Sequence, residues 1–237
     1  MTEERLTDRV RIADQEQVTA TLRSMETHFR GVCEWIGANV ERTAEAAILH
    51  RILWGAANYL HIAAENVDDH ASILALATRN LYELRLRVEY MIADTEKFIE
   101  WQAEAATDKI EVLEGILELR AGDGSESQRA ILTAEIARIR GALDRHHFSE
   151  LLRIPSSGTI AKALGRTDEH RSLFKLLSKL VHPSSYLIND YANAASEEVY
   201  TILQVHVQVY AWDLFSRSCD LLEIPEEVRK FDFGNFA

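Results

Sequence analysis

Apolar residues recur at steps of three and four along most of the chain, which is the spacing of one face of an α-helix. A helix is expected from Asp14 to Ala38, a second from an N-cap at Thr43 to Glu65, and a third from Ala71 past Trp101. The first of these carries a continuous apolar stripe formed by Val18, Leu22, Met25, Phe29, Val32 and Ile36. The pattern predicts an all-α chain folded as a multi-helix bundle.

Residues 108–148 show a different pattern, with narrow apolar stripes on strongly charged helices and a glycine-containing segment, 121–127, between them. Two such helices joined by a short loop are typical of an antiparallel hairpin. We expect one domain over residues 1–237, with 108–148 inserted as a hairpin that protrudes or packs against a partner.

The C-terminal third also predicts helices. A short helix should end at Gly165, and the next should begin with Asp168 as its cap and end before Pro183. A long helix should run from Ser196 to about Leu222, because its N-cap and its length outweigh the strand-like alternation of its valines.

Composition and charge narrow the functional classes. The formal net charge is −12, which disfavours binding to duplex DNA because both surfaces are anionic. No apolar run reaches the length of a membrane span, so we expect no membrane contact and a cytoplasmic protein. Cys33 and Cys219 lie far apart in apolar stretches and are expected to be buried free thiols.

A row of charges on the third helix is the first candidate site. Arg79, Glu83 and Arg87 are each four residues apart and share one helix face, with Tyr90 nearly in line. The row could line an interior pocket that binds an anion. It could equally form a solvated face with ordinary ion pairs, which are very common.

The segment Ser178 to Tyr186 is the second candidate site. Ser178 and His182 lie one turn apart beside Lys179, and the hydroxyl groups of Ser185 and Tyr186 follow. His182 could act as a general acid or base, or it could be a histidine that caps the helix end. His61 and Glu65 at i,i+4 could ligate a metal, but the sequence has no His-Glu-x-x-His, no paired Glu-x-x-His and no cofactor motif, so no metal and no cofactor are expected.

Arg79-x-x-x-Glu83, together with Ser178-Lys179-x-x-His182-Pro183-Ser184, resembles uncharacterised all-helical bacterial proteins. This resemblance implies a shared helical scaffold and a shared site at Arg79, Glu83, Ser178 and His182. It supplies no activity.

A more distant similarity is to the HEPN superfamily of helical bundles, many of them dimeric ribonucleases of defence and toxin systems. Their signature is an arginine four to six residues from a histidine. Arg23 with His28, and Arg140 with His146 or His147, match at about the frequency that chance gives.

Three functional hypotheses therefore stand. The first is a helical-bundle protein whose polar pocket, formed by Arg79, Glu83, Ser178 and His182, binds a small anionic ligand or RNA. The second is a HEPN-like, metal-independent ribonuclease acting as a homodimer. The third is a non-enzymatic interaction protein whose 108–148 hairpin is the contact surface.

Overall fold

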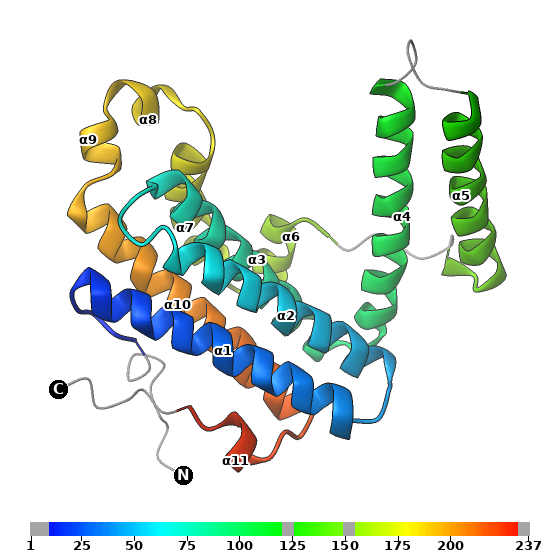
Figure 1. The fold of residues 1–237 in the computed structure, drawn as a ribbon, viewed down its shortest axis with the longest axis horizontal. Helices are drawn as coiled ribbons and strands as arrows, with labels where there is room; N and C mark the ends of the chain where they lie inside the picture. Colours follow the sequence, from blue (N-terminus) through cyan, green and yellow to red (C-terminus); the bar gives the residue numbers. More distant parts are fainter. Residues whose placement is uncertain (1–9, 120–125, 149–154, 232–237) are drawn as a thin grey trace. The chain divides into compact units, whose positions relative to one another are not determined.

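The computed structural model describes residues 10–119, 126–148 and 155–231, and these residues form helices and no strand (Figure 1). The prediction of an all-α multi-helix bundle is confirmed. The helices are α1 Gln15–Asn39, α2 Ala44–Ala64, α3 Ala71–Ala93, α4 Glu96–Leu119, α5 Glu126–Arg145, α6 Ser157–Ala163, α7 Thr167–Val181, α8 Ser185–Asn189, α9 Tyr191–Ala194, α10 Glu197–Leu221 and α11 Glu226–Arg229.

The chain divides into two compact units. Residues 1–93 and 156–237 form one, called here the main unit, and residues 94–155 form the other, called the hairpin unit. The predicted insertion at 108–148 falls inside the hairpin unit.

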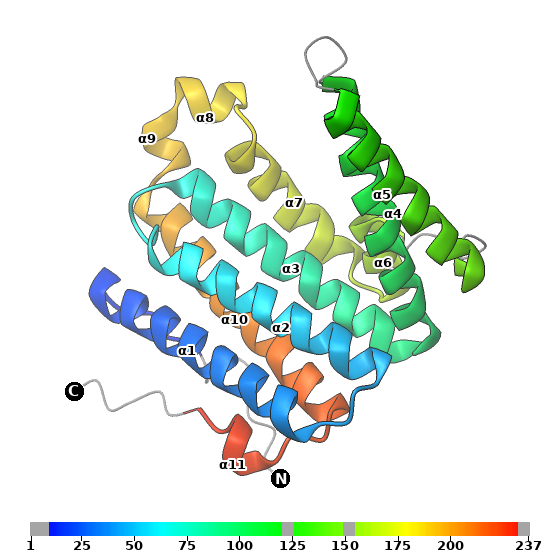
Figure 2. The same ribbon diagram turned by 45° about the vertical axis from the view of Figure 1, so that its right-hand side comes forward.

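The main unit is built around α3, which packs against α2, α7 and α10, while α1 packs against α2 (Figure 2). Aromatic side chains fill the core between α1 and α10. Phe29 stacks on Phe215 with ring centroids 4.5 Å apart, and Trp212 meets Phe29 edge-on at 5.7 Å. Such large buried rings contribute much of the hydrophobic stabilisation of a bundle. They hold α10 against the rest of the unit.

Local capping signals explain where several helices begin and end. The side chains of Asp14, Thr43 and Ser196 each accept a hydrogen bond from a backbone N–H in the first turn of α1, α2 and α10, and the caps at Thr43 and Ser196 were predicted. After α6, Gly165 has a φ of +71°, and Arg166 N–H donates to the Ala161 carbonyl. Glycine adopts this left-handed conformation readily, which closes the helix and turns the chain into α7.

Two sequence predictions about helix ends were wrong. The third helix does not continue past Trp101, because α3 ends at Ala93 and α4 begins at Glu96. The Asp94 carboxylate accepts a hydrogen bond from Glu96 N–H at 3.2 Å, which provides a start for the new helix. Asp168 lies in the first turn of α7, and the N-cap residue is Arg166, which makes no side-chain cap bond.

The hairpin unit contains α4 and α5, which run antiparallel to each other (Figure 1). Its small core consists of Ile110, Ile136 and Ile139 with a few half-buried neighbours. The predicted turn lies largely outside the described residues, at 120–125. That this hairpin contacts a partner stays a prediction.

Cys33 and Cys219 are buried free thiols, as predicted, and burial raises the pKa of each to about 12. Among the described residues, no helix combines the length and the apolar character needed to cross a membrane.

Candidate functional site

The predicted pair on α3 is formed. Arg79 Nε donates to Glu83 Oε1 at 2.9 Å, and the two side chains are 26% and 24% exposed. The Arg79 guanidinium also lies 4.8 Å from the ring centroid of Phe174 on α7. The pair therefore sits at the contact between α3 and α7, partly shielded from water. Arg87 and Tyr90, further along α3, are half-buried.

The Arg79–Glu83 pair influences the imidazole of His170, a residue that was not predicted from the sequence. The His170 ring lies 4.1 Å from the Phe174 ring. Burial lowers the pKa of His170, the Glu83 carboxylate opposes this shift, and the Arg79 cation adds to it. His170 also packs tightly on α6, since a Cβ placed on Gly158 would lie 3.3 Å from its Nε2. The pKa of this half-buried imidazole therefore lies below its usual value.

His182 lies further along α7 and does not join Arg79 and Glu83. The helices α3 and α7 run antiparallel, since Glu89 meets Arg166 while Arg79 meets Phe174. His182 comes twelve residues after His170, about 18 Å along the helix axis at 1.5 Å per residue. His182 is thus separated from the Arg79–Glu83 pair, and Ser178 lies on the turn of α7 between Phe174 and His182.

Ser178 and His182 lie in the C-terminal part of α7, where Ser178 is half-buried and His182 is exposed. Ser178 Oγ donates to the Lys175 carbonyl at 3.4 Å, and His182 is the exposed C-cap residue of α7. Beyond it, Ser185 and Tyr186 are exposed on α8. The surface residues of α7 recur at steps of three and four and so share one side of the helix. This α7 face consists of Arg171, Lys175, Ser178, Lys179 and His182.

The α7 face is positively charged in an acidic protein. The chain has six lysines and a net charge of −12, yet Lys175 and Lys179 lie together here. Arg171 pairs with Asp168 at 2.7 Å. Within the part of the chain that the structure describes, neither of these two lysines forms an ion pair. Their charges are open to an anionic partner.

A buried ion pair joins α3 to α10. Arg85 Nε donates to Asp213 Oδ2 at 2.5 Å, and the side chains are only 6% and 9% exposed. Arg217, one turn along α10, donates to the other Asp213 oxygen at 2.8 Å. Asp213 thus bridges two arginines in the interior, which is the arrangement a buried charge requires.

This pair belongs to a larger cluster that includes the start of α7. Glu89 accepts two hydrogen bonds from Arg166, at 2.9 and 3.1 Å. Glu169 lies 3.5 Å from Arg85 and accepts a hydrogen bond from the hydroxyl of Tyr210 at 3.3 Å. With Asp213 and Arg217, the cluster holds three cations and three carboxylates. Because its charges balance and pair internally, its principal effect is to fix α3, α7 and α10 together.

Next to the cluster, the Tyr82 hydroxyl is buried and has no hydrogen-bond partner among the described residues. The Tyr82 ring lies 5.0 Å from that of Tyr210, and burial raises the pKa of both phenols. A buried hydroxyl without a partner is uncommon in folded proteins.

The sequence contains a signal for Arg85 and Asp213 that differs from the row of charges at Arg79, Glu83 and Arg87. Arg85 follows Leu81 and Tyr82 and precedes Val88 on the apolar stripe of α3, and Asp213 is surrounded by apolar residues of α10. A single charge on an otherwise apolar helix face indicates a buried partner.

No group of three or more metal-ligating side chains is gathered in the described ranges. Residues 62–199, more than half of the chain, match the model of a family of unknown function (DUF5677). The chain belongs to this family. The resemblance to an uncharacterised all-helical family is confirmed, whereas the likeness to HEPN proteins stays a prediction. No curated protein and no solved structure matches the chain.

The DUF5677 region contains α3, α7 and α8 and therefore the whole α7 face. It also contains Arg85, Glu89 and Glu169, but it ends before Asp213. The buried cluster thus ties the family region to α10, outside it.

Proposed function

We propose that this DUF5677 protein binds single-stranded RNA on the α7 face. The observation that carries the proposal is the pair of exposed lysines, Lys175 and Lys179, which form no ion pair within the described residues although the chain is strongly acidic. Lysine ammonium groups bind phosphates as point charges, and each contact releases counterions from the nucleic acid. The acidic remainder of the surface repels RNA, which confines binding to this face.

Aromatic and hydroxyl groups on α7, α8 and α9 favour the binding of single-stranded RNA over duplex RNA. Tyr186 on α8 is 41% exposed, and Tyr191 on α9 is 49% exposed. Exposed aromatic rings beside a cationic stripe can stack on bases, and only unpaired bases present their faces for stacking. Ser178 and Ser185 add hydroxyl groups that can contact phosphate or ribose.

Replacing both lysines, Lys175→Gln with Lys179→Gln, should weaken binding of a labelled single-stranded RNA roughly tenfold. The dependence of log affinity on log salt should flatten by about 1.4, because two phosphate contacts are lost at about 0.7 each. Fluorescence anisotropy at several salt concentrations measures both.

The matched control removes two exposed cations elsewhere, with Arg51→Gln and Lys230→Gln. It changes the net charge by the same amount and should leave affinity nearly unchanged. Equal losses in the two double variants would mean that RNA responds only to total charge, and the proposed face would be rejected.

A second candidate function, cleavage of the bound RNA, is favoured by the position of two histidines. His70 lies nine residues before Arg79 on the α3 side, and His182 lies eight residues after Phe174. Because Arg79 contacts Phe174 and the helices are antiparallel, the two histidines stand about 13 and 12 Å from that contact, in the same direction. Both are exposed, at the same end of the main unit.

With two imidazoles at the same end of the main unit, one can act as the general base and the other as the general acid. His182 would take the proton of a ribose 2′-hydroxyl, whose oxygen attacks the adjacent phosphorus. The bond from phosphorus to the 5′-oxygen breaks, and His70 gives that oxygen a proton. The products are a 2′,3′-cyclic phosphate and a 5′-hydroxyl, and Lys179 would stabilise the charge on the reacting phosphate.

A further inference from the structure

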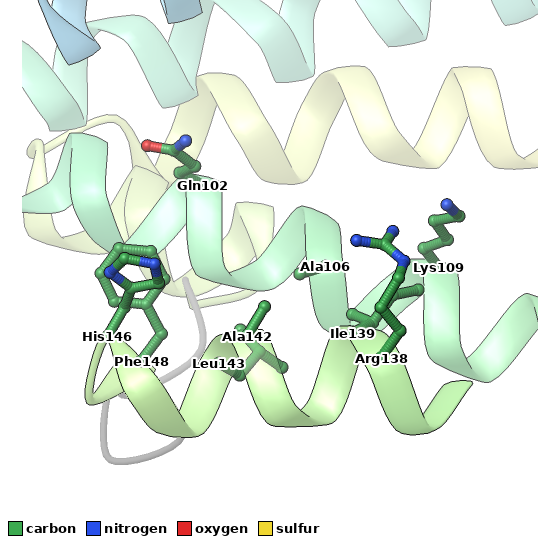
Figure 3. Close-up of a pocket in the computed structure, with 9 residues that line it drawn as sticks. All are labelled: Gln102, Ala106, Lys109, Arg138, Ile139, Ala142, Leu143, His146 and Phe148. Carbon is green, nitrogen blue, oxygen red and sulfur yellow. The ribbon is translucent and has the colours of Figure 1, made fainter. Parts of the chain in front are cut away.

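A cavity of about 280 Å³ lies between α4 and α5, within the hairpin unit (Figure 3). Its walls include the apolar side chains Ala106, Ile139, Ala142 and Leu143. The isoleucine core of the hairpin fills the neighbouring turns, whereas alanine at 106 and 142 leaves space. A cavity of this volume is slightly smaller than the sites of drug-sized ligands, about 300–1,000 Å³, and fits a smaller molecule.

The polar groups around the cavity are unevenly distributed. Lys109 and Arg138 lie at one end, while His146 and Phe148 lie at the other (Figure 3). Of the described residues that line the cavity, none is a carboxylate, although α4 is rich in glutamate. A ligand therefore meets an apolar wall and a cationic end.

The cationic end keeps a net positive charge. Glu135 lies 2.7 Å from Lys109 Nζ and 2.7 Å from Arg138 Nε. This single carboxylate therefore forms ion pairs with both cations. Hydrogen bonds from Arg138 and Lys109 lower the pKa of Glu135 to about 2, so this carboxylate is ionised at neutral pH. Two positive charges and one negative charge leave one positive charge for a ligand.

We propose that the α4–α5 hairpin binds a small amphipathic anion. Its apolar body lies against Ala106, Ile139 and Leu143, and its charged group lies beside Lys109 and Arg138. The recognised chemistry is an unbranched or aromatic apolar body of moderate size that carries a carboxylate or a sulfonate. This site is separate from the α7 face and does not depend on RNA binding.

The test uses the full chain with octanoate as the probe and octanol as its uncharged match, each titrated by calorimetry. Saturable octanoate binding is expected, with octanol at least fivefold weaker. Arg138→Gln should weaken octanoate binding severalfold and leave octanol binding unchanged, because it removes only the charge contact. Octanoate that fails to saturate, or that binds no better than octanol, overturns the proposal.

Filling the cavity provides a second, independent variant. Ala142→Leu adds a side chain into the space and should abolish binding of both probes, whereas Ala134→Leu on the exposed side of α5 should not. Circular dichroism verifies that the total helix content is unchanged in each. Unchanged octanoate binding in a folded Ala142→Leu protein would show that the probe binds elsewhere.

Discussion

Replacing Asp213 with alanine is expected to lower the free energy of unfolding by about 3 kcal/mol or more, because it leaves Arg85 buried without its closest carboxylate. Among the described residues, Arg85 would retain Glu169 at 3.5 Å and Glu89 at 3.9 Å. Arginine does not lose its proton at neutral pH, so the buried cation has no way to relieve the cost by neutralisation. Urea denaturation followed by tryptophan fluorescence measures the change.

The matched control is Glu65→Ala, which removes the carboxylate of an exposed ion pair with Arg23. Its effect should stay within about 0.5 kcal/mol, the usual range for surface pairs. The double variant Asp213→Leu with Arg85→Met should be more stable than Asp213→Ala, since it removes both buried charges. A small loss for Asp213→Ala, equal to that of Glu65→Ala, would contradict the structural role given to the cluster.

The largest expected effect on activity is that of His182→Ala on RNA cleavage. If the two-histidine arrangement acts, this change should reduce the rate of cleavage of a single-stranded RNA about 10²- to 10⁴-fold, the usual contribution of general acid–base catalysis. His70→Ala should reduce it over the same range. A labelled RNA assayed in the presence of a chelator, with detection of the cyclic phosphate product, measures the rate.

His61→Ala is the control for this prediction. His61 is an exposed histidine with a carboxylate neighbour, Glu26 at 3.1 Å, just as His70 has Asp69 at 3.6 Å. It lies on α2 and should leave cleavage unchanged. Cleavage that survives in both His182→Ala and His70→Ala would exclude these residues as catalysts, and a wild-type protein that binds RNA without cleaving it would leave binding as the function.

Local features of the fold were predictable from the sequence, and distant pairings were not. The caps at Asp14, Thr43 and Ser196 act on residues three positions away, so the sequence contains all the information needed. The ion pair of Arg79 with Glu83 follows from helical spacing in the same way. The break after Ala93 was missed because the helical pattern continues through it.

Contacts between different helices in the candidate site could not be predicted from local sequence spacing. Ser178 and His182 were predicted to share one helix face, but their position relative to Glu83 depends on how α3 packs on α7. Arg85 and Asp213 are 128 residues apart, and no local rule pairs them. The antiparallel packing of α3 on α7 separates His182 from Glu83, whereas the parallel packing of α3 on α10 brings Arg85 to Asp213.

The most direct measurement of the central claim is protection of lysines by RNA. The chain has only six lysines, and an amine-reactive reagent followed by mass spectrometry reports on each separately. Saturating single-stranded RNA should slow modification of Lys175 and Lys179 severalfold and leave Lys97, Lys109 and Lys230 unchanged. Protection absent from Lys175 and Lys179, or spread equally over all the lysines, would contradict an RNA site on the α7 face.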